Sequence, residues 1–350
     1  MAVFDLLDGG GHEQVVWGRD ATSGLRAIVA VHSTALGPAL GGVRWRTYAA
    51  EDAALVDVLR LSRGMTYKAA AAGLDLGGGK AVILAPPPGT ARMPVLRAYG
   101  RLVESLSGRY ITAEDVGTGE ADMDAIRTQT RHVTGVRESL GGSGDPSPAT
   151  ALGVFHAMGA VAQACWGTPS LGGRHVVVVG VGKVGSALVG HLVGAGATVS
   201  VADIDDVAVR SVVARHGATA VDVDDALVRP CDVLAPCALG GVLDAGTIAR
   251  LGAAAVCGSA NNQLAEVGDA ERLADAGVLY APDYVVSAGG IINIAEELRP
   301  GGYDPDRARR AVAAVGRTTA RVLGDARAAG CTPLAAADRL AESRLDAARP

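Results

Sequence analysis

The sequence predicts an α/β protein of two domains, a mixed α/β domain followed by a doubly wound parallel-sheet domain. The chain has 350 residues, a length typical of two average domains. Its second half alternates short β-branched runs with helical stretches, which is the pattern of a parallel sheet covered on both faces. A glycine-rich turn joins one of these strands to the helix that follows it, where parallel sheets commonly bind phosphate groups.

The first half shows mixed elements in a less regular order. Apolar residues at helical spacing, such as Leu55, Val58 and Leu59, indicate one long helix. We expect the glycine run Gly77–Gly79 to break the chain before the next strand. The predicted strand, helix, strand, helix and strand are Leu25–His32, Glu51–Ala72, Ala81–Leu84, Met93–Leu106 and Arg109–Ala113.

The second half is more regular. Its predicted strands are His175–Val179, Thr198–Ala202, Ala218–Val221, Asp232–Ala235, Ala254–Cys257 and Val278–Tyr280. The helices between them are Val184–Leu192, Val207–Arg215, Asp224–Val228, Asp244–Leu251 and Ala265–Ala276. The segment Gly141–Pro148 is the best candidate for a linker between domains. After Pro305 we expect one long Arg/Ala helix and, beyond Cys331–Pro333, a final helix.

Composition excludes several classes of protein. The formal net charge is −5 and there are no Lys/Arg runs, so nothing supports binding to nucleic acid. No apolar stretch is long enough to cross a bilayer, and the N-terminus does not resemble a signal peptide. Five irregularly spaced cysteines fit a reduced, cytoplasmic protein better than a disulfide framework. No Cys/His spacing typical of zinc occurs, so we expect no metal site.

The glycine-rich turn has the context of a dinucleotide site. Gly180, Gly182 and Gly185 form a GxGxxG pattern that follows the strand His175–Val179 and opens a helix. These glycines allow a tight turn and close approach of a pyrophosphate, which the helix N-terminus stabilises. Asp203, after the next strand, can bind ribose hydroxyls and would repel a 2′-phosphate. The pattern favours NAD over NADP in a Rossmann-type domain.

Lys183 and Val184 lie inside the same pattern and are assigned to the cofactor site with it. Lys183 can place positive charge near the phosphates, or it can be a solvated loop lysine. The alternative is that this is an ordinary glycine turn of an α/β domain that binds no cofactor. The strand Thr198–Ala202 and Asp203 after it favour the dinucleotide site over that alternative.

Lysine usage points to a second site. Only three of the 32 basic residues are lysines, namely Lys68, Lys80 and Lys183. Lys68 lies late in a predicted helix and Lys80 follows the glycine run, so both can face one site. Two ammonium groups held close together each lose a proton more readily, which is one way to make lysine a base. Asp115, at a strand end, could supply an acid. The alternative is two surface lysines and a strand-capping acid.

At these residues the sequence resembles a known family. The segment GPALGGVRWRTYAAEDAALVDVLRLSRGMTYKAAAAGLDLGGGKAVI is similar to the substrate domain of the glutamate/leucine/phenylalanine/valine dehydrogenase superfamily. The segments TAEDVGTGEADM, DPSPATALGVF, VVVVGVGKVG, APCALGG, GSANNQLAE and YAPDYVVSAGGIINIAEEL resemble it in the same order. The resemblance covers nearly the whole chain.

The resemblance implies roles for individual residues. Lys68 would bind the substrate α-carboxylate, Lys80 would activate water as the general base, and Asp115 would relay protons to and from the amine. The other implied substrate residues are Gly41, Gly42, Met65 and Asn262. The other implied cofactor residues are Thr150, which would hold the carboxamide, and Ala235, Cys237 and Asn261.

The implied reaction is the reversible oxidative deamination of an amino acid. Hydride transfer from Cα to the nicotinamide leaves an iminium ion, which water attacks. Ammonia then departs and a 2-oxo acid remains. Two cationic lysines suit a carboxylate substrate and the charge that develops during hydration.

The same resemblance bears on the substrate side chain. Glutamate enzymes carry a lysine just before the paired glycines, where this chain has Leu40, so an apolar substrate is implied. Leu40, Ala113, Ile291 and Ile294 would line the side-chain pocket. Branched-chain enzymes often have valine at the last two positions. The larger isoleucines favour valine as substrate, with a leucine or phenylalanine dehydrogenase as the close alternative.

Two alternatives come from other classes: a non-catalytic NAD-binding homologue and a hydroxy-acid dehydrogenase. The intact set Lys68, Lys80 and Asp115 argues against the first, and the lack of an Arg/His motif argues against the second. We expect a substrate domain over residues 1–136, an NAD domain over 137–310, and C-terminal helices over 311–350 that return to the first domain. The resemblance also implies a homo-oligomer.

Overall fold

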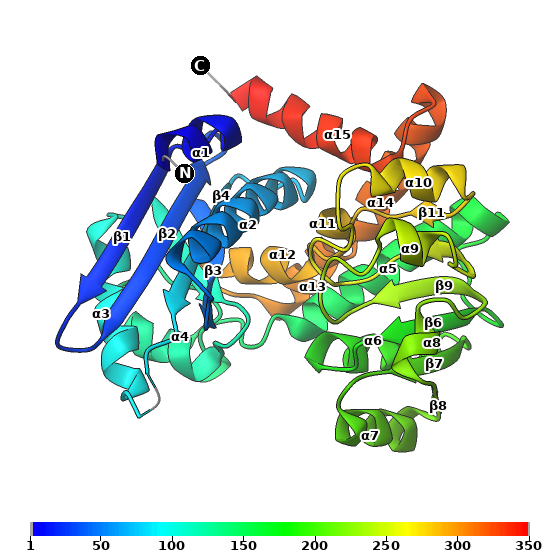
Figure 1. Cartoon of the computed structure of the whole chain (residues 1–350), viewed down its shortest axis with the longest axis horizontal. Coiled ribbons are helices and arrows are strands. Elements are labelled where there is room, and N and C mark those ends of the chain that lie inside the picture. The colour runs from blue at the N-terminus through cyan, green and yellow to red at the C-terminus, as the bar shows by residue number, and fades with distance from the viewer. Residues whose placement is uncertain (1–2, 88, 349–350) are drawn as a thin grey trace. The chain divides into compact units, whose positions relative to one another are not determined.

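The computed structural model describes residues 3–87 and 89–348, which fall into two compact units (Figure 1). The first unit consists of Met1–Asp145, Ile294–Pro305 and Ala341–Pro350. The second consists of Pro146–Asn293 and Asp306–Leu340. The chain therefore leaves the first unit and returns to it twice.

A five-stranded mixed sheet forms the centre of the first unit, in the order β1-β2-β4-β3-β5. The strands are β1 (Gln14–Asp20), β2 (Leu25–Ser33), β3 (Ala39–Arg46), β4 (Gly77–Leu84) and β5 (Tyr110–Glu114). β2 is antiparallel to β1 and β4, whereas β3 is parallel to β4 and β5. The parallel part therefore brings the ends of β3 and β5 to one edge, where Asp115 follows β5.

Helices cover both faces of this sheet. They are α1 (Val3–Gly10), α2 (Glu51–Ala71), α3 (Arg92–Ser105) and α4 (Glu120–Arg127), followed by a 3₁₀ turn at Glu138–Leu140. Side chains alternate along β2: Val29 joins a core with α3 and α4, and Ile28 and Ala30 join a core with α2. The predictions that placed β2, α2, α3 and β5 are confirmed to within a residue or two, but β1, β3, α1 and α4 were missed.

The glycine run before Lys80 corrects one prediction. Gly77–Gly79 do not break the chain; they are the first residues of β4, hydrogen-bonded on both sides. A Cβ at Gly77 would collide with the carbonyl of Ser33, and one at Gly78 would collide with Thr66 of α2. Glycine inside a strand here serves the close approach of neighbouring backbone.

The second unit contains a six-stranded parallel sheet in the order β11-β10-β9-β6-β7-β8. Its strands are β6 (His175–Val179), β7 (Thr198–Ala202), β8 (Thr219–Ala220), β9 (Cys231–Pro236), β10 (Ala253–Val256) and β11 (Leu279–Tyr280). Read outward from β6, this is the strand order of the Rossmann fold, in which the sequence reverses direction between β6 and β9. The predicted fold class is confirmed, and all six predicted strands are present.

The helices after residue 146 follow the predicted alternation; the first two helices between the strands are slightly longer than predicted, and the next three are shorter. They are α5 (Ser147–Trp166), α6 (Lys183–Gly194), α7 (Asp206–His216), α8 (Val223–Ala226), α9 (Ala245–Ile248), α10 (Asp269–Asp275), α11 (Asp283–Val286), α12 (Gly289–Ala295), α13 (Pro305–Val312), α14 (Ala314–Ala329) and α15 (Pro333–Ala348). Beyond α12, a 3₁₀ turn spans Glu296–Leu298. The predicted long Arg/Ala helix is two helices separated at Ala313. α5 begins within the predicted linker, with Pro148 in its first turn, a position where proline is tolerated.

None of the helices within residues 3–87 and 89–348 combines the length and apolar character needed to cross a membrane.

Candidate functional site

Two glycines of β3 form the floor of the first candidate site. A Cβ at Gly41 would collide with the carbonyl of Gly79 on β4, and one at Gly42 would collide with the carbonyl of Glu114. A Cβ placed at Gly42 would also lie 2.9 Å from Cβ of Asp115. Both glycines are buried, so no other residue fits at either position without moving the sheet. The structure brings Gly42 close to Asp115, and the contact of both glycines with a substrate stays a prediction.

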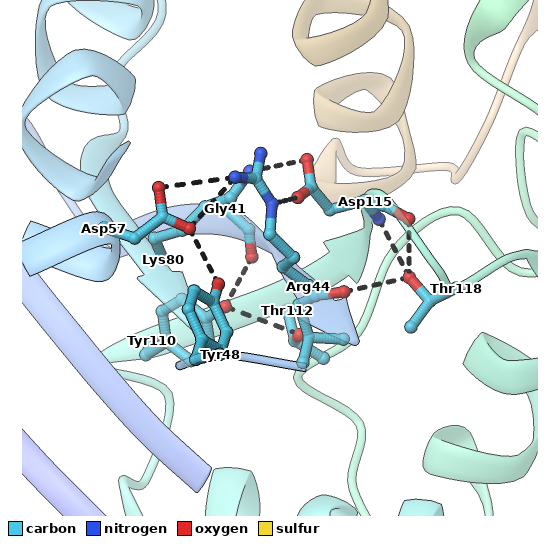
Figure 2. A network of polar contacts seen from close by, with 10 residues as sticks. Gly41, Arg44, Tyr48, Asp57, Lys80, Tyr110, Thr112, Asp115 and Thr118 are labelled. Atoms are coloured by element: carbon cyan, nitrogen blue, oxygen red, sulfur yellow. Dashed lines mark hydrogen bonds and ion pairs between the residues drawn. The ribbon is translucent and has the colours of Figure 1, made fainter. Parts of the chain in front are cut away.

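Lys80 and Asp115 lie directly together beside these glycines. Nζ of Lys80 is 2.8 Å from Oδ1 of Asp115, and the two side chains are 7% and 13% exposed (Figure 2). Lys80 extends from the middle of β4 and Asp115 follows the last residue of β5. The structure therefore brings together Lys80 and Asp115, the two residues predicted to be catalytic, and their roles stay predictions.

The second oxygen of Asp115 binds a cation that the sequence did not single out. Nε of Arg44 lies 2.8 Å from Oδ2 of Asp115. One terminal nitrogen of the same guanidinium lies 3.0 Å from Oδ2 of Asp57 on α2, which also accepts a 2.7 Å hydrogen bond from the Tyr48 hydroxyl. Figure 2 shows these side chains as one continuous network. With 29 arginines in the chain, Arg44 carried no compositional signal.

This network sets the charge of Asp115. Burial alone would raise the pKa of the Asp115 carboxyl, but the Lys80 ammonium and the Arg44 guanidinium hold it at about 2. Burial would lower the pKa of Arg44, and the Asp115 and Asp57 carboxylates together raise it. Asp115 is therefore a carboxylate at any pH where the protein would work, able to accept a proton.

Hydrogen bonds also fix the backbone around the site. The Thr118 hydroxyl accepts a 2.9 Å hydrogen bond from the backbone N–H of Asp115 and lies 2.9 Å from the carbonyl of Val43. The buried Tyr110 hydroxyl donates to the carbonyl of Gly41 at 2.5 Å. These contacts tie the end of β5 to β3, so the position of Asp115 relative to Gly41 is fixed by the sheet.

Helix α2 carries the other predicted substrate residues. Lys68, in its last turn, is 9% exposed. The side chain of Met65 lies one turn earlier, 3.4 Å from the Cβ position of Gly41. The C-terminal end of α2 is capped from α15: one nitrogen of Arg344 lies 2.7 Å from the carbonyl of Leu74 and 3.2 Å from that of Ala70. The guanidinium adds hydrogen bonds and a positive charge at the C-terminal end of the helix, where the helix dipole favours a cation.

The apolar residues predicted for the side-chain pocket are all buried. Leu40 of β3 is 0% exposed, and Ala113 of β5, 2% exposed, lies opposite Gly42 in the sheet register. Ile291 and Ile294 lie on α12 and are 5% and 6% exposed. Leu40, Ala113 and Ile294 belong to the first unit, and Ile291 to the second.

The glycine-rich turn of the second unit has the shape that a pyrophosphate needs. Gly180 has φ +100°, in the region that favours glycine. A Cβ at Gly185 would collide with the carbonyl of Gly180, so helix and turn are in close contact. Gly182 has open space around its Cβ position and caps the N-terminus of α6, with Lys183 and Val184 as the first helical residues. Asp203 accepts a 2.7 Å hydrogen bond from the N–H of Val181.

The remaining predicted cofactor residues lie on neighbouring loops of the second unit. Ala235, at the end of β9, is fully buried, and Cβ of Cys237 lies 3.4 Å from the Cβ position of Gly185. Asn261 and Asn262 are exposed, and Asn262 has φ +53°. Thr150, in the first turn of α5, lies beside Gly290, whose Cβ position is 2.6 Å from the threonine hydroxyl. Cys237 therefore packs against the glycine-rich turn, whereas Thr150 packs against α12.

Gln263 is a further residue that the sequence missed. Its side chain is 0% exposed and donates hydrogen bonds to the carbonyls of Gly258 and Ala260 at 2.8 and 3.1 Å. These bonds hold the turn that presents Asn261 and Asn262. Among the described residues, no group of three or more His, Cys, Asp or Glu side chains could hold a metal ion.

A Rossmann-type sheet with an open glycine turn, and a separate unit with a buried lysine–aspartate pair, together define the class of two-domain amino acid dehydrogenases. Comparison with known proteins agrees. The family described as "Glu/Leu/Phe/Val dehydrogenase, dimerisation domain" matches residues 12–132, and "Glutamate/Leucine/Phenylalanine/Valine dehydrogenase" matches residues 201–300.

Curated relatives match over the full length. A valine dehydrogenase of Streptomyces virginiae is 52% identical over 98% of this chain and 96% of its own. A leucine dehydrogenase of Bacillus subtilis is 48% identical over 100% and 95%. Among solved structures, L-tryptophan dehydrogenase from Nostoc punctiforme is 41% identical, with a TM-score of 0.83 over 99% of each chain. The chain belongs to the Glu/Leu/Phe/Val dehydrogenase family and is an amino acid dehydrogenase, which confirms the resemblance found in the sequence.

Proposed function

We propose that this protein catalyses the reversible, NAD-dependent oxidative deamination of branched-chain L-amino acids, with valine preferred, to a 2-oxo acid and ammonia. The observation that carries the proposal is the buried Lys80–Asp115 pair beside Gly41 and Gly42, in a chain 52% identical to a valine dehydrogenase. A lysine that donates a hydrogen bond to a carboxylate, beside two glycines that expose only backbone, suits a small zwitterionic substrate.

The second unit fits NAD. Gly182 leaves open space at the N-terminus of α6, where a pyrophosphate would face the N–H groups of the first helical turn. Lys183 and Val184 would flank it, and Asp203 would bind the adenosine ribose and disfavour a 2′-phosphate. Thr150, Ala235, Cys237 and Asn261 would line the nicotinamide half. NAD, when bound, accepts the hydride that leaves the substrate Cα.

The first unit supplies binding and proton transfer. Lys68 would bind the α-carboxylate, with Gly41, Gly42 and Met65 around it. Asn262 would orient the substrate near the nicotinamide. Lys80 would take a proton from the water that attacks the iminium carbon. Asp115 is ionised next to Lys80, so it would accept the proton from the amino group and return it when ammonia departs.

Substrate choice would come from the pocket of Leu40, Ala113, Ile291 and Ile294. All four side chains are apolar and buried, so a charged substrate side chain would have no partner. Leucine and phenylalanine remain the alternatives, because one methylene changes binding by only about 1–3 kcal/mol.

Each unit would have its own task, with residues 1–136 as substrate domain, residues 137–310 as NAD domain and residues 311–350 as helices that return to the first. We also propose a homo-oligomer, since the family matched by residues 12–132 is described as a dimerisation domain. A cytoplasmic location stays a prediction from cysteine usage.

The experiment is a panel of L-amino acids with NAD or NADP at alkaline pH, read as absorbance of the reduced cofactor. We expect the fastest turnover with valine and NAD. The variant Lys80→Ala is the control for the mechanism. An absence of turnover with every amino acid would reject the proposal and leave the non-catalytic and hydroxy-acid dehydrogenase alternatives.

A further inference from the structure

Arg44 holds a position between two carboxylates that no role assigned above explains. Its side chain is 12% exposed, and its Nε and one terminal nitrogen bind Asp115 and Asp57 at 2.8 and 3.0 Å. The four charges therefore alternate in the order Lys80, Asp115, Arg44, Asp57. The network is neutral overall: Asp115 lies between two cations, whereas Asp57 pairs with Arg44 and accepts a hydrogen bond from the Tyr48 hydroxyl (Figure 2).

The inner aspartate is shared by two cations, each bound to its own oxygen. Lys80 lies against Oδ1 and Arg44 against Oδ2. A carboxylate that faced Lys80 alone would favour the charged ammonium strongly, because an opposite charge at this distance stabilises the protonated form. A base must give up that proton before it can take one from water. Arg44 divides the charge of Asp115 and so weakens its hold on Lys80.

We infer that Arg44 is a positioning residue for the proposed reaction: it fixes Asp115 as a carboxylate and shares its charge, so that Lys80 can release its proton. Asp57 and Tyr48 hold the far side of the guanidinium. The inference rests on the proposed roles of Lys80 and Asp115 and extends them to the residue that controls their protonation.

Arginine suits this role better than lysine. Its planar fork reaches two carboxylates at once and keeps its charge at any working pH. The titratable groups around Asp115 are Lys80, Arg44 and the hydroxyl of Tyr110. Those around Arg44 are Asp115, Asp57 and Tyr48. Tyr48 also lies under the guanidinium of Arg46, whose carbon is 5.7 Å from the ring centre.

The test is the pH profile of kcat/KM for valine, measured for the full-length enzyme and four variants. Arg44→Met removes the charge and Arg44→Lys keeps it without the fork. Asp57→Asn removes the outer carboxylate. Arg60→Met is the matched control, since it deletes an exposed arginine on α2, the helix that carries Asp57.

We expect Arg44→Met to move the rising limb of the profile toward alkaline pH by about one unit or more. At neutral pH its kcat/KM should fall by about 10²-fold. Arg44→Lys should keep the limb near its wild-type position while kcat falls several-fold. Asp57→Asn should leave the limb in place or move it toward acid, because a negative charge has been removed. Arg60→Met should match the wild type.

A purely structural role predicts a different result. Loss of packing alone would lower kcat/KM of Arg44→Met at every pH without moving the midpoint of the rising limb. The pH profile of Arg44→Lys would then have the same shape as that of Arg44→Met. Either result would overturn the inference. If Arg44→Met does not fold, the Arg44→Lys and Asp57→Asn profiles still decide, because a limb that moves toward alkaline pH in Asp57→Asn contradicts the charge argument. An inactive wild type would instead reject the proposed function itself.

Discussion

Lys80 and Asp115 lie 35 positions apart in the sequence and form a buried ion pair, with 2.8 Å between Nζ and Oδ1. The parallel sheet brings them together, because β4 and β5 both pair with β3. In the proposed reaction Lys80 would take a proton from water, and Asp115 would transfer protons to and from the amino group. The predictions below test this pair and the residues around it.

Lys80→Ala should lower kcat by about 10²–10⁴-fold, the usual contribution of a positioned proton-transfer group. Lys80→Arg should not recover it, because a guanidinium does not deprotonate. Lys183→Arg is the control, since an exposed lysine at the proposed phosphate site would need only its charge. Steady-state kinetics measure all three. Equal damage in Lys183→Arg and Lys80→Arg would contradict our ranking of the lysines.

Asp115 should make stability depend on pH in acid. Its folded pKa of about 2 lies below the ordinary value of 3.8. Its contribution is therefore present above about pH 4 and is lost as pH falls toward about 2, and its size is about 2 kcal/mol. Urea unfolding between pH 5 and 3 should show a weaker pH dependence for Asp115→Asn. Asp75→Asn, whose carboxylate is 92% exposed, should behave as wild type.

Gly41→Ala should disrupt the first unit, because its methyl group would collide with the carbonyl of Gly79 inside the sheet. We expect a loss of several kcal/mol, as for overpacked cores. Gly64→Ala, in α2 with nothing within 4 Å of its Cβ position, should instead stabilise by about 0.5–1 kcal/mol. Thermal unfolding compares the two. A fully stable Gly41→Ala would mean that β3 and β4 are farther apart than described.

Asp203→Ser should weaken NAD and favour NADP, since the carboxylate that would bind the ribose is removed. We expect KM for NAD to rise by about 10-fold or more, equivalent to about 1.4 kcal/mol. Asp206→Asn, in the first turn of α7 and exposed, is the control. Cofactor selectivity that stays unchanged in Asp203→Ser would place the ribose elsewhere.

Ile291→Val and Ile294→Val should enlarge the proposed pocket by one methylene each. The ratio of kcat/KM for leucine to that for valine should rise by about 10-fold, within the 1–3 kcal/mol that a methylene contributes. Val285→Ala, a buried position on the neighbouring helix α11, controls for general loosening. A ratio that changes equally in all three variants would remove these isoleucines from the pocket.

The sequence alone determined the class of fold and the type of chemistry. Alternation of strands and helices predicted the six-stranded sheet, because a parallel sheet buries both faces and its strands are short apolar runs. The GxGxxG pattern is local in sequence, so its turn and helix could be located without tertiary information. The scarcity of lysine singled out Lys68, Lys80 and Lys183, and the place of Asp115 at a strand end suggested an acid. The family resemblance then implied a role for Lys68, Lys80 and Asp115.

Tertiary structure alone decided what surrounds these residues. Arg44 and Asp115 are 71 positions apart, and their contact depends on the pairing of β3 with β5. Nothing in the sequence around Arg44 distinguishes it from the other 28 arginines as the one that contacts Asp115. The glycine run was interpreted as a break because sequence cannot distinguish a flexible turn from a strand that other backbone approaches closely. Local patterns specify elements, whereas charge networks and close approaches depend on residues that only the folded sheet brings together.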